Sequence, residues 1–152
     1  MADDKIIFDL VSPERLLLSE AVDMVVVPGS EGNFGVLPGH ALFISTVRPG
    51  VIDVYDGTQI GERIFVSGGF AEVTPERCTV LADEAMPLSS LDAAAIEAGM
   101  RTLEGTAANL RDRVARLSGP ERDEAALELR AAEQRIATES AKLEALRQGA
   151  PH

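Results

Sequence analysis

The spacing of apolar residues changes near residue 87, and this change constrains the fold more than any other feature of the chain. Up to residue 87, short β-branched runs alternate with turns rich in glycine and proline, as in antiparallel β proteins. Beyond it, apolar residues recur every three or four positions, as on one face of a long helix. The sequence therefore predicts a β domain at 1–87, a helical domain at 88–148 and a loose tail at 149–152.

The first part of the chain contains runs of about five to eight residues with the character of strands. Alternation of apolar and polar residues is clear at 51–56 and at 6–10. Short strands separated by regular turn signals indicate an antiparallel β-sandwich or barrel, and we predict the sandwich. The predicted strands are KIIFDLVS, RLLLS, VDMVVV, ALFISTV, GVIDVYD, ERIFVSG, FAEVT and RCTVLAD.

The second part is predicted to form two helices, at about 91–117 and 120–148. Ser89 or Ser90 can cap the first helix, and Asp92 suits its first turn because a carboxylate favours the positive end of the helix dipole. The break at 118–120 is so short that the helices must be antiparallel neighbours. Their apolar seam contains Ala93, Ile96, Met100, Leu103, Ala107, Leu110, Val114, Leu117, Ala125, Leu129, Ala132, Ile136, Leu143 and Leu146. The predicted fold class is α+β by domains, a β-sandwich followed by an antiparallel two-helix hairpin.

Three residues weaken this helical pattern. Glu139 is a polar residue within the apolar seam. Gly99 and Gly105 lie inside the first helix, where each costs about 1 kcal/mol relative to alanine. Two interpretations of the glycines stay open, namely close packing against a neighbour and a helix that is meant to give way.

Charge and composition exclude several classes of protein. A net charge of −11 would repel nucleic-acid phosphates, so no nucleic-acid partner is expected. No apolar run approaches the ~20 residues that span a bilayer, and the acidic start of the chain shows no export leader. The single cysteine, Cys78, excludes an internal disulfide and is expected to pack as a small apolar residue.

Residues 25–41, VVVPGSEGNFGVLPGHA, have the composition of a functional loop. A phosphate loop is excluded because no lysine follows the glycines, Pro38 prevents a helix from starting there, and Glu31 repels phosphate. A metal site needs several converging ligands, whereas His40 is the only internal histidine and is expected to be a turn residue bonded to backbone. What remains is a glycine-rich tip that carries Phe34 next to Asn33. An aromatic residue on such a loop most often folds back onto its own sandwich and, when exposed, is usually a contact anchor. We predict that Glu31 and Phe34 are exposed for contact with a partner.

We expect none of the acid pairs to lie among apolar residues that would raise a carboxyl pKa for acid catalysis. We therefore predict no catalytic residue, no metal ligand and no bound cofactor. Two alternatives from other classes remain at this point. One is a β-sandwich binding module with a coiled-coil dimerisation tail, and the other is a small jelly-roll enzyme, against which the shortage of histidines counts. The acid pairs considered are Asp3-Asp4, Asp53 with Asp56, Asp83-Glu84, and Glu121 with Asp123-Glu124.

The segment VVVPGSEGNFGVLPGHA, followed by TVRPG, FVSGGFAEV and VLADEA, closely resembles the epsilon subunit of bacterial F-type ATP synthases. The resemblance is specific over residues 5–86 and covers the helical part by architecture and length. It implies a non-catalytic rotor subunit at the foot of the central stalk, between the gamma subunit and the loops of the membrane ring of c subunits. It also implies a peripheral position at the cytoplasmic face of the bacterial inner membrane, in a complex that couples proton transport to ATP synthesis.

The resemblance implies which residues contact partners. The positions that match the family's ring-contacting segment are Ser30, Glu31, Gly32, Asn33 and Phe34, and His40 is added as a further contact residue. Family members often carry a second acid just after this glycine, where the present chain has asparagine. The charge contact that this second acid would make with a basic ring loop is therefore expected to be missing. Glu31 is expected to contact the loop in its place.

The resemblance also implies two states of the helices and, in some members, ATP binding. The helices fold beside the sandwich or extend along gamma toward the alpha and beta catalytic subunits, where they restrain ATP hydrolysis. The family's ATP motif, I/L-D-x-x-R-A, matches here at Arg130 and Ala131 but has Leu127 in place of the acid, so no ATP binding is expected. Residues 120–148 hold five basic and seven acidic residues, so we predict weak or absent inhibition of hydrolysis.

Overall fold

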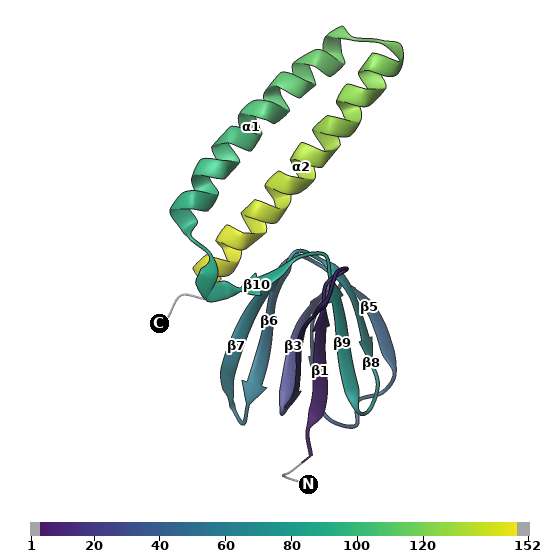
Figure 1. Ribbon diagram of the computed structural model, residues 1–152, viewed down its shortest axis with the longest axis vertical. Coiled ribbons are helices and arrows are strands. Elements are labelled where there is room, and N and C mark those ends of the chain that lie inside the picture. Colours follow the sequence, from purple (N-terminus) through teal and green to yellow (C-terminus); the bar gives the residue numbers. More distant parts are fainter. Residues whose placement is uncertain (1–3, 149–152) are drawn as a thin grey trace. The chain divides into compact units, whose positions relative to one another are not determined.

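The structure, a computed structural model, describes residues 4–148 and separates a β unit from a helical unit (Figure 1). The boundary between the two units falls after Ser90, whereas the sequence places it at residue 87. The difference is the short helix η1 (Leu88–Ser90), whose Leu88 is buried and lies near strand β7. The predicted tail at 149–152 lies outside the described residues.

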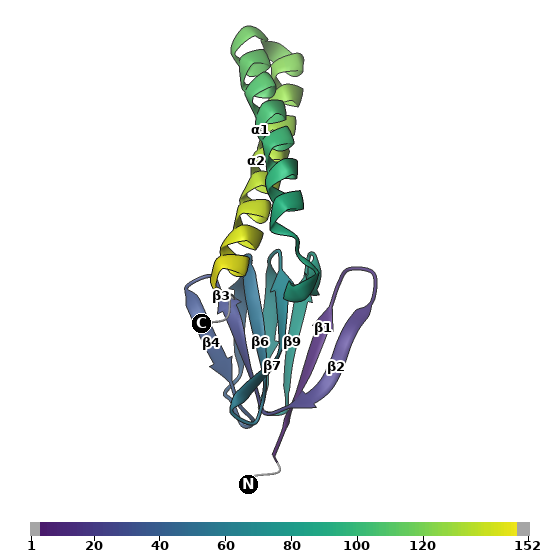
Figure 2. The ribbon, with the colours of Figure 1, turned by 90° about the vertical axis from the view of Figure 1, so that its left-hand side faces the viewer.

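The β unit is a ten-stranded sheet with the strand order β10-β7-β6-β3-β5-β8-β9-β1-β2, in which β4 pairs with β3 off this path. The sheet curls over on itself into a sandwich, as the sequence predicts (Figures 1 and 2). Its neighbours are antiparallel except for β1 and β9, which are parallel. The strands are β1 (Ile6–Val11), β2 (Leu16–Val22), β3 (Met24–Gly29), β4 (Gly32–Val36), β5 (Phe43–Val47), β6 (Gly50–Asp56), β7 (Gln59–Val66), β8 (Gly69–Val73), β9 (Arg77–Ala82) and β10 (Ala85–Pro87).

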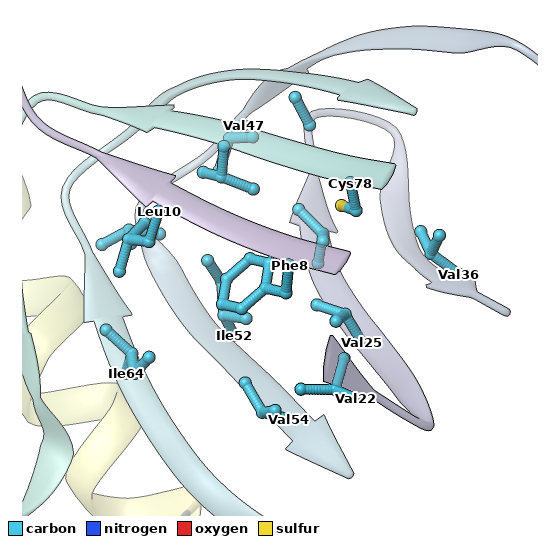
Figure 3. Packing of buried hydrophobic residues seen from close by; sticks show 14 of the residues in the cluster. Phe8, Leu10, Val22, Val25, Val36, Val47, Ile52, Val54, Ile64 and Cys78 are labelled. Atoms are coloured by element: carbon cyan, nitrogen blue, oxygen red, sulfur yellow. The ribbon is translucent and has the colours of Figure 1, made fainter. Parts of the chain in front are cut away.

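Alternation along each strand decides which side chains enter the core. On β1, Ile6, Phe8 and Leu10 point inward and are almost fully buried, because successive side chains of a strand face opposite sides of the sheet. Phe8 lies beside Ile52 of β6, from the opposite layer (Figure 3). Cys78 is fully buried in this same cluster, as expected for a packed apolar residue.

Two strands are missing from the sequence-based prediction. β4 was expected to be part of a loop, because its glycines at 32 and 35 read as turn signals. It is nevertheless paired with β3 along its whole length, from Gly29 opposite Gly32 to Val25 opposite Val36. β10 is only three residues long and pairs with β7.

The helical unit is an antiparallel hairpin of α1 (Ala93–Arg116) and α2 (Gly119–Gln148) (Figures 1 and 2). The first helix starts two residues later than predicted, because Asp92 is itself the N-cap. Its carboxylate accepts hydrogen bonds from the backbone N–H groups of Ala94 (3.0 Å) and Ala95 (3.4 Å). The predicted capping role of Ser89 or Ser90 is wrong, since both lie in η1 and Ser90 donates to the Pro87 carbonyl.

The seam between the helices rests on small side chains. Its apolar cluster consists of Ala107, Leu110 and Ala132, with Leu129 and Ile136 packed against them. Alanine contributes little apolar area, so each turn of this seam stabilises the hairpin only weakly. No helix within residues 4–148 is both long enough and apolar enough to cross a membrane.

Within residues 4–148, nothing packs closely against the two glycines of α1. A Cβ atom built at Gly99 or Gly105 would meet no heavy atom within 4 Å. Close packing against another part of the described chain is therefore not the reason for these glycines. Glu139, the polar residue of the seam, is buried but paired, with Arg135 and Lys142 each 3.1 Å from its Oε1.

Substituting the glycines of α1 tests how far they weaken the hairpin. Gly99→Ala and Gly105→Ala should each raise the free energy of unfolding of the helical unit by up to about 1 kcal/mol, because alanine fits the open space and stiffens the helix. Thermal unfolding followed by circular dichroism at the helix band measures this. Gly119→Ala is the matched control and should destabilise, since Gly119 has φ +65°. A loss of stability at both α1 positions would contradict the expectation.

The β unit is predicted to fold without the helices. A chain that ends at Ser90 should keep a cooperative β unfolding transition, because its core is enclosed by its own strands. A chain that ends at Pro87 should be less stable by about 1.5–3 kcal/mol, the value of burying a leucine side chain, since Leu88 is lost. Urea unfolding of both chains measures the difference, and a disordered 1–90 chain would show that the two units are not separable.

Candidate partner-binding surfaces

The β3–β4 hairpin carries five of the six predicted contact residues. Its two strands are joined by a turn of Ser30 and Glu31, both of which are exposed. The pair that closes the turn is Gly29 opposite Gly32. In Figure 2, β4 lies beside β3 at one margin of the β unit. The segment predicted as a flexible loop is thus a tight hairpin whose turn projects one carboxylate.

Glycine is required on both sides of this turn. A Cβ at Gly29 would lie 2.8 Å from the Gly32 carbonyl oxygen and 2.9 Å from the Phe34 ring, both far inside van der Waals contact. Gly32 has φ +135°, a conformation that residues with a side chain rarely adopt. The glycine spacing that suggests a phosphate loop in the sequence therefore serves a close backbone turn.

The turn is tied to the end of β5. The backbone N–H of Ser30 donates to the Thr46 carbonyl (3.0 Å), and the Thr46 hydroxyl donates to Ser30 Oγ (2.8 Å). Arg48, just beyond β5, donates from its guanidinium to the Gly29 carbonyl (2.5 Å) and to Asn33 Oδ1 (2.7 Å). Asn33 is thus engaged within the chain, whereas Glu31 points its charge to solvent.

Phe34 is not the exposed anchor that the sequence suggested. It is half-buried, packs against the sandwich core and meets Phe43 edge-on, with ring centroids 5.1 Å apart. The reason is its position on a strand: register partner Val27 is fully buried, so position 34 also faces inward. His40 is a turn residue, as expected, with Nδ1 2.7 Å from the Ala41 carbonyl and its backbone N–H bonded to Leu37.

A second surface is a row of side chains that crosses five strands, which we call the outer row. Thr46, Phe70, Leu81, Val11 and Leu16 follow one another as register partners across β5, β8, β9, β1 and β2. Phe70, Leu81 and Leu16 are 57%, 50% and 58% exposed, although they are large apolar residues. The row begins at Thr46, which touches the β3–β4 turn, so it is continuous with that turn.

The outer row was missed in the sequence, although a signal for it exists. A strand read from the sequence does not show which strands lie beside it, and an apolar residue in a strand ordinarily belongs to the core. On β8, Ala71 and Val73 are buried on the core side. Phe70 alternates with them along the strand, so its side chain must face outward. Contiguous exposed apolar side chains of this kind mark sites of contact with other proteins.

Two carboxyl groups in the sandwich have raised pKa values. Burial raises the pKa of Asp53, and the positive charge of Arg63 lowers it by a smaller amount. Arg63 Nε lies 3.3 Å from Asp53 Oδ1, so the two side chains form an ion pair, but their geometry is not that of a hydrogen bond. The sequence-based expectation that this acid keeps an unraised pKa is wrong. Burial, together with the charge and hydrogen bond of Glu62, also raises the pKa of Glu20.

Cys78, the buried thiol of the sandwich, also has a raised pKa. Burial, helped by the charge of Asp9, raises the pKa of Cys78 to about 12, so this thiol stays protonated and unreactive at neutral pH. Within residues 4–148, no three histidine, cysteine or acidic side chains gather in a way that could hold a metal ion.

The residues of the degenerate ATP motif lie on the exposed face of α2. Leu127 is 65% exposed, and Arg130 and Ala131 follow it on the same side of the helix. A leucine at the acid position offers no acceptor for a ribose or base donor. The α2 cations Arg135, Lys142 and Arg147 are each paired with an acid of the same helix.

Comparisons with known proteins give a consistent result. Residues 5–88 match the family model described as ATP synthase, Delta/Epsilon chain, beta-sandwich domain. The ATP synthase epsilon chain of Rhodospirillum centenum is 50% identical over 143 residues, which cover 93% of this chain and 91% of the relative. That of Rhodospirillum rubrum is 61% identical over 97 residues, which cover 64% of this chain and 72% of the relative.

Solved structures share the fold. A chain in the Euglena gracilis mitochondrial ATP synthase structure, OSCP/F1/c-ring in rotational state 1, aligns with a TM-score of 0.62 at 23% identity, covering 91% of this chain and 81% of that chain. A chain of the Tetrahymena thermophila mitochondrial ATP synthase central stalk/c-ring structure aligns with a TM-score of 0.50 at 12% identity, covering 91% and 97%.

A β-sandwich with an exposed apolar row, followed by a helical hairpin, defines a subunit built to contact other protein chains. The chain belongs to the family of ATP synthase epsilon chains, which are stalk subunits of the complex and not catalytic ones. The resemblance read from residues 5–86 is thereby confirmed. The alternatives of a free-standing binding module and of a jelly-roll enzyme are set aside.

Separating Phe34 from Glu31 by mutation tests the division between core and surface in the hairpin. Phe34→Ala should lower the free energy of unfolding by about 2 kcal/mol, roughly half the cost of truncating a fully buried phenylalanine, because the ring is half-buried. Glu31→Ala should leave it within about 0.5 kcal/mol of the parent chain, as is usual for exposed residues. Urea unfolding of the isolated chain measures both. Equal effects of the two substitutions would contradict the structure.

Proposed function

We propose that this epsilon chain links the gamma subunit to the loops of the c-ring, so that rotation driven by proton transport is passed through the central stalk. One observation carries the proposal: the β unit presents two kinds of contact surface that are continuous with each other. These are the apolar outer row and the braced turn with its exposed carboxylate, Glu31. Two surfaces of different chemistry allow one chain to join two different partners.

The outer row is assigned to gamma. Phe70, Leu81 and Leu16 offer a broad apolar contact, and burial of such side chains supplies the larger part of a stable protein interface. A permanent contact within the rotor requires this type of surface. The turn is assigned to the c-ring loops, because a single exposed acid suits a basic loop and gives orientation more than affinity.

We propose with this same assignment that the subunit lies peripherally at the cytoplasmic face of the bacterial inner membrane. Its contact with the membrane is indirect, through the c-ring loops that reach out of the bilayer. The catalytic alpha and beta subunits are partners only when the helices extend. His40, bonded to the neighbouring backbone, is proposed to hold the shape of the 37–41 segment beside the apolar side chains of Leu42 and Ile44.

Binding to gamma tests the assignment of the outer row. Phe70→Asp and Leu81→Asp should each weaken binding of purified gamma by at least about tenfold, because a charge would be buried in an apolar contact. Glu72→Lys on the same strand is the matched control, since it changes charge on the outer face but outside the apolar row. Calorimetric titration measures the affinities, and circular dichroism checks that each variant stays folded. Unchanged binding in both row variants would disprove the assignment.

The helices are proposed to regulate hydrolysis only weakly. The acidic surplus of α2 and the internal pairing of Arg135, Lys142 and Arg147 leave little positive charge for docking on an acidic segment of the catalytic subunits. Extension is nevertheless physically accessible, because the seam is built from alanine and α1 carries two open glycines.

Reconstitution of the catalytic complex tests this regulatory role. Complexes with the full chain and with the chain that ends at Ser90 should hydrolyse ATP at rates within about twofold of each other, the factor that a fraction of a kcal/mol would produce. Quantification of the bound subunit controls for loss of assembly. A several-fold rise in hydrolysis on removal of the helices would show that they inhibit strongly.

A further inference from the structure

Arg48 contacts the β3–β4 hairpin at both of its strands. Its Nη1 donates to the Gly29 carbonyl at the end of β3 (2.5 Å), and its Nη2 donates to Asn33 Oδ1 on β4 (2.7 Å). Its backbone N–H donates to the Pro28 carbonyl (2.9 Å). The guanidinium is a planar fork, so two such contacts fix its orientation as well as its position.

The hairpin needs such support because its own end is weak. Pro28 opposes Asn33 and has no N–H to donate, and Gly29 opposes Gly32 without any side chain to pack. The last pair before the turn therefore has no cross-strand side-chain contact, and the pair before it lacks one backbone donor. The contacts from Thr46 and Arg48 compensate for this from outside the hairpin.

We propose that Arg48 is a positioning residue that locks the β3–β4 turn and thereby presents Glu31 to a basic segment of a partner. This inference deepens the proposed function and rests on its assignment of the turn to the c-ring loops. Arg48 does not itself supply the acidic contact. It sets the geometry of the two turn residues, Ser30 and Glu31, by holding the strand residues on either side of them.

The same geometry changes the meaning of position 33. The sequence suggests that Asn33 replaces an acid that would contact the ring. In the structure, position 33 faces Arg48, so a carboxylate there would pair with that guanidinium within the subunit. Asparagine keeps the hydrogen bond without the charge. The recognition charge of the turn is therefore Glu31, whichever of the two residues occupies position 33.

Hydrogen exchange of the Ser30 amide in the isolated full chain reports on the lock, because this amide is bonded to Thr46 across the turn. Arg48→Ala should speed its exchange by roughly tenfold, Asn33→Ala should speed it by a smaller factor because the contact with Gly29 remains, and the double variant should be no faster than Arg48→Ala. Arg48→Lys, which can reach one acceptor, should give an intermediate rate. Arg15→Ala is the matched control with an exposed arginine elsewhere on the β unit.

The outcomes of this measurement are decisive in either direction. Independent, multiplying effects of the two alanine substitutions would overturn the lock, as would an unchanged rate in Arg48→Ala. The buried Val80 amide serves as an internal reference for global unfolding. If Arg48→Ala does not fold, the exchange rate of the Ser30 amide in Asn33→Ala still tests the lock. Asn33→Ala removes only one contact of an exposed side chain.

Proton pumping per ATP hydrolysed, in membrane vesicles that carry the assembled complex, tests the presentation of Glu31. Glu31→Lys and Arg48→Ala should both lower this ratio by at least twofold, whereas Asn33→Asp and Arg15→Ala should preserve it. If Glu31→Lys has no effect, the assignment of the turn to the ring fails. The hydrogen-exchange rates then still test whether Arg48 holds the turn. If Glu31→Lys lowers the ratio but Arg48→Ala does not, although exchange is faster, the positioning role is wrong.

Discussion

The pairing of Gly29 on β3 with Val47 on β5 is the contact on which the closure of the β unit depends. β3 pairs with β6 along residues 24–26 and reaches β5 at Gly29, so it connects the two layers of the sandwich. The backbone can make this turn because position 29 has no side chain; a Cβ would collide with the Gly32 carbonyl and the Phe34 ring. Closure of the layers in turn encloses the core around Phe8 and Ile52. The β3–β4 turn begins at this same residue, so the core and the proposed contact share one constraint.

The acidic character of the chain is compatible with a tight sandwich because its buried carboxylate is compensated. Asp9 is almost fully buried on β1, where burial alone would raise its pKa. Hydrogen bonds from Ser19 and Arg77, with the charge of Arg77, outweigh burial and lower the pKa below its ordinary value. The ionised form of Asp9 therefore stabilises the fold at neutral pH, and this contribution is lost as the pH falls through the lowered pKa. Three strands are joined by this one side chain.

The two units differ in how firmly they are built. The sandwich rests on large β-branched and aromatic side chains that are almost fully buried, whereas the helical seam rests on alanine and a few leucines. Of the ion pairs within α2, Arg147 with Glu144 lies at the surface and contributes little, whereas the pairs that Arg135 and Lys142 make with Glu139 serve to compensate a buried carboxylate. A firmly packed β unit and a hairpin with a weak seam suit the proposal that the permanent contacts lie on the sandwich. Any change of state would then be confined to the helices.

The sequence by itself determined the two-part organisation, most strands, both helices and the family, because these depend on local periodicity and on segments that can be read in order. It also determined the burial of Cys78, which lies within an alternating strand. Tertiary structure decided the rest. The turn-like glycines of β4 became a strand because β3 supplies the missing hydrogen bonds, and Phe34 turned inward because its register partner is core. Asn33 faces Arg48, and Phe70 aligns with Leu81 and Leu16, through pairings between residues far apart in the chain. Register is a relation between strands, so no single segment of the sequence contains it.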